Sequence, residues 1–128
     1  MPEQKFILEA KKKYSAIKSP VFCSCLNRNI NITSDGFMHL LRKGNGLARN
    51  IEEIRYKTKR IPLIAPVIMN ASDASYEKRL VRKNAKKNAP LVQAEYWGIE
   101  ANVGKTPINV RVIIRRVGDG QAHFWSVM

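Results

Sequence analysis

The chain has few of the residue types that build metal centres and disulfide-stabilised folds. Its 128 residues include only two cysteines, two histidines and ten acidic residues. Cys23 and Cys25 are so close in the chain that a bridge between them would be strained, and we expect two free thiols in a reducing compartment. Two thiols alone do not make a zinc site. A two-metal nuclease needs clustered acids, so the scarcity of carboxylates predicts no metal and no cofactor.

The chain also lacks a long apolar run and a Gly-rich phosphate loop. Its longest apolar stretch, Ile61 to Met69, is too short to span a bilayer and contains Pro62 and Pro66. Residues 1–13 lack the apolar core of a signal peptide. We therefore predict no membrane insertion and a cytoplasmic site of action. A secreted or phage-delivered origin would require another export route or a removed upstream region.

What the chain has in excess is positive charge. Lys and Arg total 23, and the formal net charge is +13 at neutral pH. Such a charge favours a polyanionic partner, either nucleic acid or an anionic membrane surface, but says little about the fold. Apolar residues make up 45% of the chain, enough for one domain over residues 1–128 with a substantial core.

The hydrophobic periodicity predicts helices in the first half of the chain. The N-terminal segment 1–20 contains a basic helix over residues 3–18, and one or two short strands follow within 21–33. A second helix begins at a Ser34 or Asp35 cap and runs to Lys43, before Gly44. The capping pair of Asn50 and Glu53 opens a third helix that ends at about Arg60.

The second half of the chain is expected to be richer in strands. Residues 61–69 fit either a helix or a buried strand, and residues 72–88 fit a polar basic helix or a mobile excursion. Three strands, over 91–101, 108–117 and 121–127, are joined by links short enough for antiparallel neighbours. The expected fold class is α+β, with N-terminal helices packed on a C-terminal antiparallel β-meander.

The last hairpin places basic side chains beside a histidine. Alternation on the strand 108–117 puts Arg111 and Arg115 on the face opposite its apolar residues. A two-residue turn would pair Arg116 with His123, whereas a three-residue loop over 118–120 would pair Arg115 with it. We favour the three-residue loop, which gives the sheet a single anion-binding face.

Only His39 and His123 are candidates for acid–base chemistry at neutral pH by residue type. Two imidazoles among arginines suit RNA cleavage without metal, since one group removes the 2′-hydroxyl proton and another protonates the leaving 5′-oxygen. Arg or Lys would stabilise the charge that develops on phosphate. The alternative is that both histidines are structural, which is the more common role of a histidine on a strand.

Several short motifs together resemble a known nuclease group. They are the strand-like Asn29–Thr33, the helical segment Gly36–Leu41 with His39, the run Ile61–Ile64, and the terminal pair Val112–Arg116 and Gly120–Val127. Over residues 29–128 the chain resembles the phage and polymorphic-toxin branch of the barnase–EndoU–colicin–RelE nuclease superfamily. Members are metal-independent RNases, commonly toxins against tRNA or mRNA.

This resemblance implies catalytic roles for His39, His123 and an arginine of the middle strand, Arg111 or Arg115. Ser126 would be an auxiliary hydrogen-bond donor, although a regular strand would place it on the face opposite His123. No acid stands where a barnase-like general base is expected, unless Glu95 or Glu100 serves.

The functional hypothesis is therefore a toxin-type endoribonuclease that leaves a 2′,3′-cyclic phosphate, with tRNA as the expected target. An acidic antitoxin or immunity protein would be its protein partner. The main alternative is a non-catalytic RNA- or DNA-binding module, and a helix-turn-helix over 35–60 ranks last. Phosphate contacts are expected from Arg42, Lys43, Lys105, Arg116 and the basic 78–87 region, with Arg82 and Lys83.

Overall fold

The chain forms an α+β fold, as the hydrophobic periodicity predicts. The computed structural model describes residues 2–42, 47–82 and 88–128. In chain order, the elements within these residues are α1 (Pro2–Ser15), β1 (Val21–Cys23), β2 (Arg28–Ile30), α2 (Ser34–Leu41), α3 (Ile51–Thr58), α4 (Ile61–Asn70), β3 (Ala74–Arg82), β4 (Leu91–Val103), β5 (Ile108–Val117) and β6 (His123–Val127).

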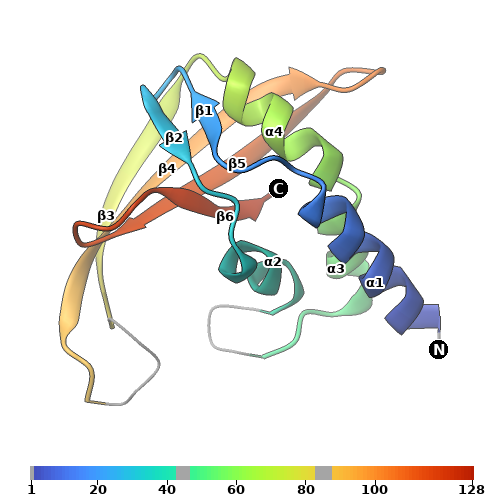
Figure 1. Cartoon of the computed structure of the whole chain (residues 1–128), viewed down its shortest axis with the longest axis horizontal. Helices are drawn as coiled ribbons and strands as arrows, with labels where there is room; N and C mark the ends of the chain where they lie inside the picture. Colours follow the sequence, from blue (N-terminus) through green and yellow to red (C-terminus); the bar gives the residue numbers. More distant parts are fainter. Residues whose placement is uncertain (1, 43–46, 83–87) are drawn as a thin grey trace.

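The strands form two antiparallel sheets. β3 to β6 make a four-stranded meander in the order β3-β4-β5-β6, and β1 and β2 form a separate two-stranded hairpin. In Figure 1, α4 lies across one face of the meander, whereas α2 lies alongside β6 and α3 follows next to α2. The opposite face of the meander is thus left to carry polar side chains.

The core lies between α4 and the meander. Ile61, Ile64 and Ile68 of α4 are fully buried, as are Ile99, Val110, Val112 and Ile114 of the sheet. Residues 61–69, which fit either a helix or a strand by sequence, form a helix. Pro62 is tolerated because it lies in the first turn, where a missing N–H costs little. Pro66 removes one helical hydrogen bond, and the buried isoleucines offset that loss.

The expectation of a polar helix or a mobile excursion over 72–88 is wrong for its described part. Ala74 to Arg82 form an edge strand that pairs with β4 from Ile99 to Leu91. Nearly every side chain of β3 is exposed, so the strand has no apolar face that alternation could reveal. Its stability comes from the ladder with β4, a partner that the local sequence does not encode.

The start of α2 also differs from the expected cap. Thr33, not Ser34 or Asp35, occupies the N-cap position, and its side chain makes no cap hydrogen bond. The Thr33 carbonyl instead accepts a hydrogen bond of 2.6 Å from the Tyr14 hydroxyl, which ties the start of α2 to α1. The helix ends at Leu41, and the expected stop near residues 43–44 lies outside the described residues.

A glycine lets α2 approach β6 closely. A Cβ atom at Gly36 would lie 2.6 Å from the Phe124 carbonyl oxygen and 2.7 Å from the Tyr14 hydroxyl. Tyr14 packs against both Phe37 and Phe124, at ring distances of 5.3 and 5.9 Å. This contact fixes the position of α2 beside the last strand.

The predicted capping box of α3 is confirmed. The Asn50 side chain accepts a 2.8 Å hydrogen bond from the Glu53 backbone, and its amide donates to the Glu53 carboxylate at 3.1 Å. Arg49 forms an ion pair with the same carboxylate at 3.3 Å. The entry to α3 is therefore well defined, which fixes the face that this helix turns inward.

Candidate active site

The register of the last hairpin is the one that a three-residue loop predicts. Arg115 of β5 pairs with His123 of β6. Arg111 pairs with Glu100 of β4 on the same ladder. Cross-strand partners share a face of a sheet, so His123 lies on the face of Arg111 and Arg115.

A β-bulge at Trp125 brings Ser126 to that same face. Ile114 pairs with Phe124, but Ile113 pairs with Ser126, so Trp125 is the extra residue. Because Ile113 lies between Arg111 and Arg115 in the alternation, its partner Ser126 faces the same way as His123. On a regular strand His123 and Ser126 would lie on opposite faces, but the bulge places both on the same face.

The indole of Trp125 contacts side chains from three elements. The His39 imidazole of α2 stacks on it with ring centres 4.2 Å apart and an interplanar angle of 18°. The Arg115 guanidinium lies 4.2 Å from the ring centre. His123 meets the indole edge-on at 5.9 Å. Both histidines and Arg115 therefore converge on one aromatic ring.

Beside this cluster lies a pocket of about 720 Å³ between α2, α3 and the polar face of the meander, called here the His39 pocket. Its titratable and cationic lining comprises His39, Arg49, Lys57, Glu77, Arg79 and Arg111, and Tyr96, Trp125 and Ser126 also contribute. His123 and Arg115 are not among its lining residues; both contact Trp125, which forms part of the wall.

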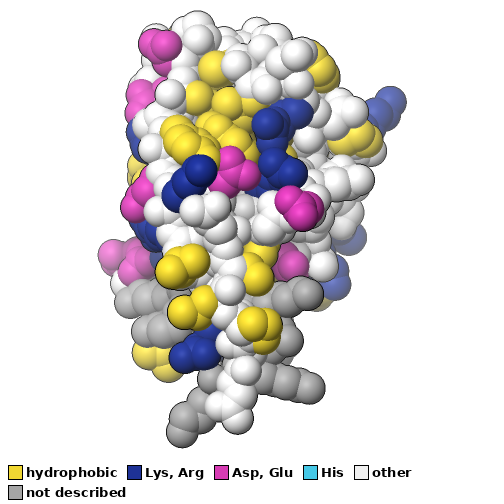
Figure 2. All heavy atoms as spheres, turned by 90° about the vertical axis from the view of Figure 1, so that its left-hand side faces the viewer, with side chains coloured by type: hydrophobic (Ala, Val, Ile, Leu, Met, Phe, Trp, Pro, Cys, Tyr) yellow, Lys and Arg dark blue, Asp and Glu magenta, His cyan; other side chains and the backbone are white. Residues whose placement is uncertain are grey.

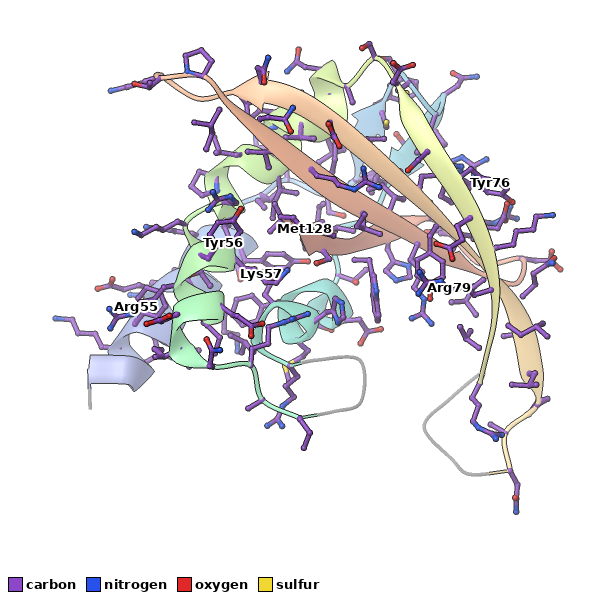
Figure 3. The ribbon with its side chains drawn as sticks, turned by 180° about the vertical axis from the view of Figure 1, so that it is seen from behind. Arg55, Tyr56, Lys57, Tyr76, Arg79 and Met128 are labelled. Carbon is purple, nitrogen blue, oxygen red and sulfur yellow. The ribbon has the colours of Figure 1, made fainter. Side chains whose placement is uncertain are left out.

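Lys57, like Arg49, is a site residue that the sequence patterns do not predict. Its side chain is 9% exposed, and its ammonium donates to Ser126 Oγ at 3.2 Å and to the Val127 carbonyl at 3.0 Å. In Figure 3 it points from α3 toward the C-terminal end of β6 and Met128. Its position three residues after the buried Ile54 is the signal that could have identified it, because helical spacing puts both on the inner face.

Ser126 is not seen in the expected role of hydrogen-bond donor. Its hydroxyl oxygen accepts from the Lys57 ammonium, and the residue is only 5% exposed. An ammonium group has three donors, and the two bonds to Ser126 and Val127 leave the third for a molecule in the pocket. Ser126 thus orients Lys57.

The two nitrogen bases of the pocket have displaced pKa values. Burial, reinforced by the positive charges of Arg49, Lys57 and Arg115, lowers the pKa of His39 to about 4. Burial and the neighbouring Arg49 lower the pKa of Lys57 to about 8, against the opposing effect of Glu53. At neutral pH the imidazole is therefore neutral while most Lys57 side chains remain protonated. Burial also lowers the pKa of His123.

The two candidate arginines of β5 differ in their contacts. Arg111 donates to Glu100 at 2.9 Å and to Ser75 at 3.1 Å. A side chain at Gly98 would collide with the Arg111 guanidinium. Arg115 contacts Tyr96 and Trp125 through its cationic group, and its buried Nε has no hydrogen-bond partner among the described residues.

Of the other residues expected to bind RNA, Arg79 of the basic 78–87 region lines this pocket, whereas the individually named ones that the structure describes do not. Arg42 is exposed at the end of α2, and Lys105 is exposed in the β4–β5 turn. Arg82 donates to the Ala89 carbonyl at 3.3 Å. Arg116 pairs with Glu95, on the sheet face opposite Arg115. Lys43 and Lys83 lie outside the described residues.

The carboxylates considered as general bases are engaged elsewhere. Glu100 forms an ion pair with Arg111 at 2.9 Å, and Glu95 pairs with Arg116 and accepts from the Tyr76 hydroxyl. Glu77, which lines the His39 pocket, makes two hydrogen bonds with Arg79. These pairings leave His39 as the base best placed in the pocket.

Cys23 and Cys25 are free thiols, as expected from their spacing. Within the described ranges, no three His, Cys, Asp or Glu side chains gather in a way that could hold a metal ion. Among the helices of the described residues, none is long and apolar enough to cross a membrane.

Comparison with known proteins adds no relative to this picture. No family model, curated protein or solved structure matches the chain. The chemistry of the site must therefore be argued from its own residues.

Proposed function

We propose that this protein is a metal-independent endoribonuclease of toxin type, belonging to the barnase–EndoU–colicin–RelE superfamily. It would cut RNA by attack of the 2′-hydroxyl on the adjacent phosphorus, leaving a 2′,3′-cyclic phosphate and a free 5′-hydroxyl. The observation that carries this proposal is the joint placement of His39 and Lys57 in one pocket, on a sheet face that also carries arginines.

The protonation states of these two residues suit opposite roles. A general base must be unprotonated and a general acid protonated at the working pH. His39, whose pKa is lowered to about 4, can take the 2′-hydroxyl proton. Lys57, whose pKa is lowered to about 8, can give a proton to the leaving 5′-oxygen. Two groups whose environments separate their protonation states are typical of an acid–base pair.

Arginines of the pocket would stabilise the charge on the reacting phosphate. Arg49, Arg79 and Arg111 line the pocket with His39. Each has a partner that holds it in place: Glu53 for Arg49, Glu77 for Arg79, and Glu100 for Arg111. Oriented cations need little reorganisation as charge develops, which is the source of electrostatic catalysis.

His123 has a different place in this scheme from His39. It contacts the edge of Trp125 and pairs with Arg115, but it does not line the pocket. We assign it the role of holding Trp125, the ring on which His39 stacks. His123→Ala tests the hypothesis of two catalytic imidazoles against this assignment. A loss of cleavage as large as that of the His39→Ala variant is expected if His123 reacts with RNA, and a smaller loss if it holds Trp125.

The surface charge supports the remaining parts of the proposal. A net charge of +13 favours a polyanionic substrate such as tRNA. It also favours an acidic antitoxin or immunity protein as the partner that covers the pocket, because complementary charge accelerates association.

The test is incubation of the protein with total tRNA in the presence of EDTA. We expect RNA fragments that end in 2′,3′-cyclic phosphate, and no fragments with the His39→Ala variant at equal concentration. Lys12→Ala, which removes an exposed cation of α1, serves as the matched control and should cleave normally. RNA binding without any product would show instead the non-catalytic binding module.

A further inference from the structure

A second polar pocket lies at the other end of the β5–β6 hairpin. It has a volume of about 500 Å³ and is formed by the β1–β2 hairpin and the β5–β6 turn. We call it the carboxamide pocket, because its lining includes the side chains of Asn27, Asn29, Asn31 and Gln121, together with Arg28 and Arg116. We propose that it binds a nucleobase of the RNA substrate, an inference that rests on the proposed function.

Two of the amides are arranged to read the edge of a base. The Asn31 amide nitrogen donates a short hydrogen bond to the Gln121 side-chain oxygen. This bond leaves the Asn31 oxygen as an acceptor and the Gln121 nitrogen as a donor for a ligand. Nucleobases in single strands expose a donor next to an acceptor on their edges, and paired amide groups bind such edges. The pocket is of the size that small ligands occupy.

The two arginines of this pocket are already held in position. Arg116 donates from Nε to the Gly120 carbonyl at 2.8 Å and from Nη1 to Glu95 at 3.4 Å. The Arg28 guanidinium lies 4.8 Å from the ring centre of Trp97. Planar guanidinium groups stack on bases and bind the flanking phosphates. No Asp or Glu is found among the described residues that line the pocket, so the lining itself carries no negative charge.

The backbone connects this pocket to the His39 pocket. Asn31 forms a parallel bridge with His123, with the Asn31 N–H donating to Ala122 at 3.0 Å and the Phe124 N–H donating to Asn31 at 2.8 Å. His123 in turn contacts Trp125 in the wall of the His39 pocket. The two pockets thus adjoin the same short segment of β6, on opposite faces of the meander.

This side of the molecule is not simply a basic surface. Figure 2 shows Lys and Arg side chains interspersed with acidic, apolar and uncharged ones, not gathered in one continuous patch. Attraction by charge alone would require clustered cations. The convergence of amide groups at the β5–β6 turn therefore favours recognition of a base over capture of any anion.

The experiment uses the inactive His39→Gln protein, so that binding is measured without cleavage. Each of the four ribonucleoside 5′-monophosphates and inorganic phosphate are titrated separately, with NMR shifts or calorimetry as the readout. We expect at least one nucleotide to bind more tightly than phosphate. Adding Gln121→Ala should weaken that binding about tenfold, the value of one lost paired contact to a base edge.

A matched amide pair elsewhere provides the control. Asn109 donates to Asn102 at 3.5 Å on the exposed β4–β5 hairpin, so Asn109→Ala removes the same chemistry outside the pocket and should leave binding unchanged. Binding of nucleotides no tighter than that of phosphate, or equal binding by the Gln121→Ala protein, overturns the inference.

The failure of this inference and of the proposed function can be told apart. If tRNA is not cut but nucleotide binding depends on Gln121, the nucleobase site is supported and the proposed ribonuclease activity is rejected. If tRNA is cut and Gln121→Ala changes neither KM nor the base preference of cleavage, the ribonuclease activity is supported and the nucleobase site is rejected.

Discussion

The two pockets that adjoin β6 differ in the kind of side chain that they present. The His39 pocket contains two bases with lowered pKa values, His39 and Lys57, and cations paired with carboxylates. The carboxamide pocket contains amides and two arginines, which are hydrogen-bonding groups. One pocket has the groups for proton transfer, and the other has only groups for recognition.

This difference is produced by what packs against each end of the hairpin. α2 and α3 cover one end and remove His39 and Lys57 from water, which lowers both pKa values. The other end meets only the short β1–β2 hairpin and remains exposed at Gln121. We therefore expect substitutions in the His39 pocket to alter the rate and pH dependence of cleavage. Substitutions in the carboxamide pocket should alter the affinity for RNA.

The largest effect is expected from His39→Gln. Loss of the general base should slow tRNA cleavage by about 10²–10⁴-fold, with RNA binding largely preserved. Glutamine keeps a polar planar group against Trp125, and circular dichroism would show that the fold is retained. Cleavage within threefold of the normal rate would show that His39 is not the general base. The functional difference between the two pockets would then be unsupported.

Lys57→Arg should have the next largest effect. Arginine keeps the positive charge but does not release its proton in proteins. We expect cleavage to fall by about 100-fold while affinity for RNA changes little. The normal enzyme should be most active between pH values near 4 and 8, where His39 is neutral and Lys57 is charged.

The pH profile of Lys57→Arg checks the assignment of the acid. With no group left to deprotonate near 8, the alkaline decline in rate should disappear from the residual activity. An alkaline decline that persists unchanged would assign the acid to another group. Gln121→Ala should keep both limbs of the profile, because the substitution removes an amide, which is not an acid–base group.

Stability should respond to pH through the same two residues. Between pH 6.5 and 4 the unfolded chain binds a proton at His39 that the folded chain does not, so the free energy of unfolding falls as the pH falls. Between pH 10.5 and 8 Lys57 acts in the same direction, so the free energy of unfolding rises as the solution becomes more alkaline.

Urea unfolding at several pH values would measure these slopes. His39→Gln should flatten the acidic window relative to the normal protein, and Lys57→Met should flatten the alkaline one. Gln121→Ala should leave both slopes unchanged. Equal slopes in all four proteins would show that burial does not shift the pKa values of His39 and Lys57. That result would contradict the difference between the two pockets.

The sequence predicts the strand register and side-chain faces of this site better than its acid–base residues. Alternation on β5 and the length of the last loop correctly place Arg111 and Arg115 on one face and pair Arg115 with His123. These are local features, because a strand alternates with a fixed period and a short loop allows few registers. The cap at Asn50 is predicted correctly for the same reason.

The parts that the sequence does not predict depend on distant partners. Lys57 belongs to the site because it bonds Ser126 and Val127 at the far end of the chain. β3 is a strand because β4 supplies its hydrogen bonds. The bulge at Trp125 decides which face Ser126 occupies, and no turn or glycine signal marks it in the sequence.

The smallest effect is expected from Ser126→Ala, which tests how Lys57 is held. The change removes one of the two acceptors of the buried ammonium and leaves the Val127 carbonyl. We expect the free energy of unfolding to fall by about 1–2 kcal/mol and cleavage at neutral pH to fall less than tenfold. Because the charged form of Lys57 loses an acceptor, its pKa should fall further, and the alkaline limb should move to lower pH.

The direction of that shift separates two roles for Ser126. A limb that moves to lower pH shows that the hydroxyl stabilises the Lys57 ammonium. A loss of activity as large as that of His39→Gln, with the limb unmoved, would show instead that Ser126 itself contacts the reacting phosphate, as the resemblance to toxin nucleases implies. The same substitution should not alter nucleotide binding at the carboxamide pocket, since Ser126 and Gln121 lie at opposite ends of the β6 hairpin segment.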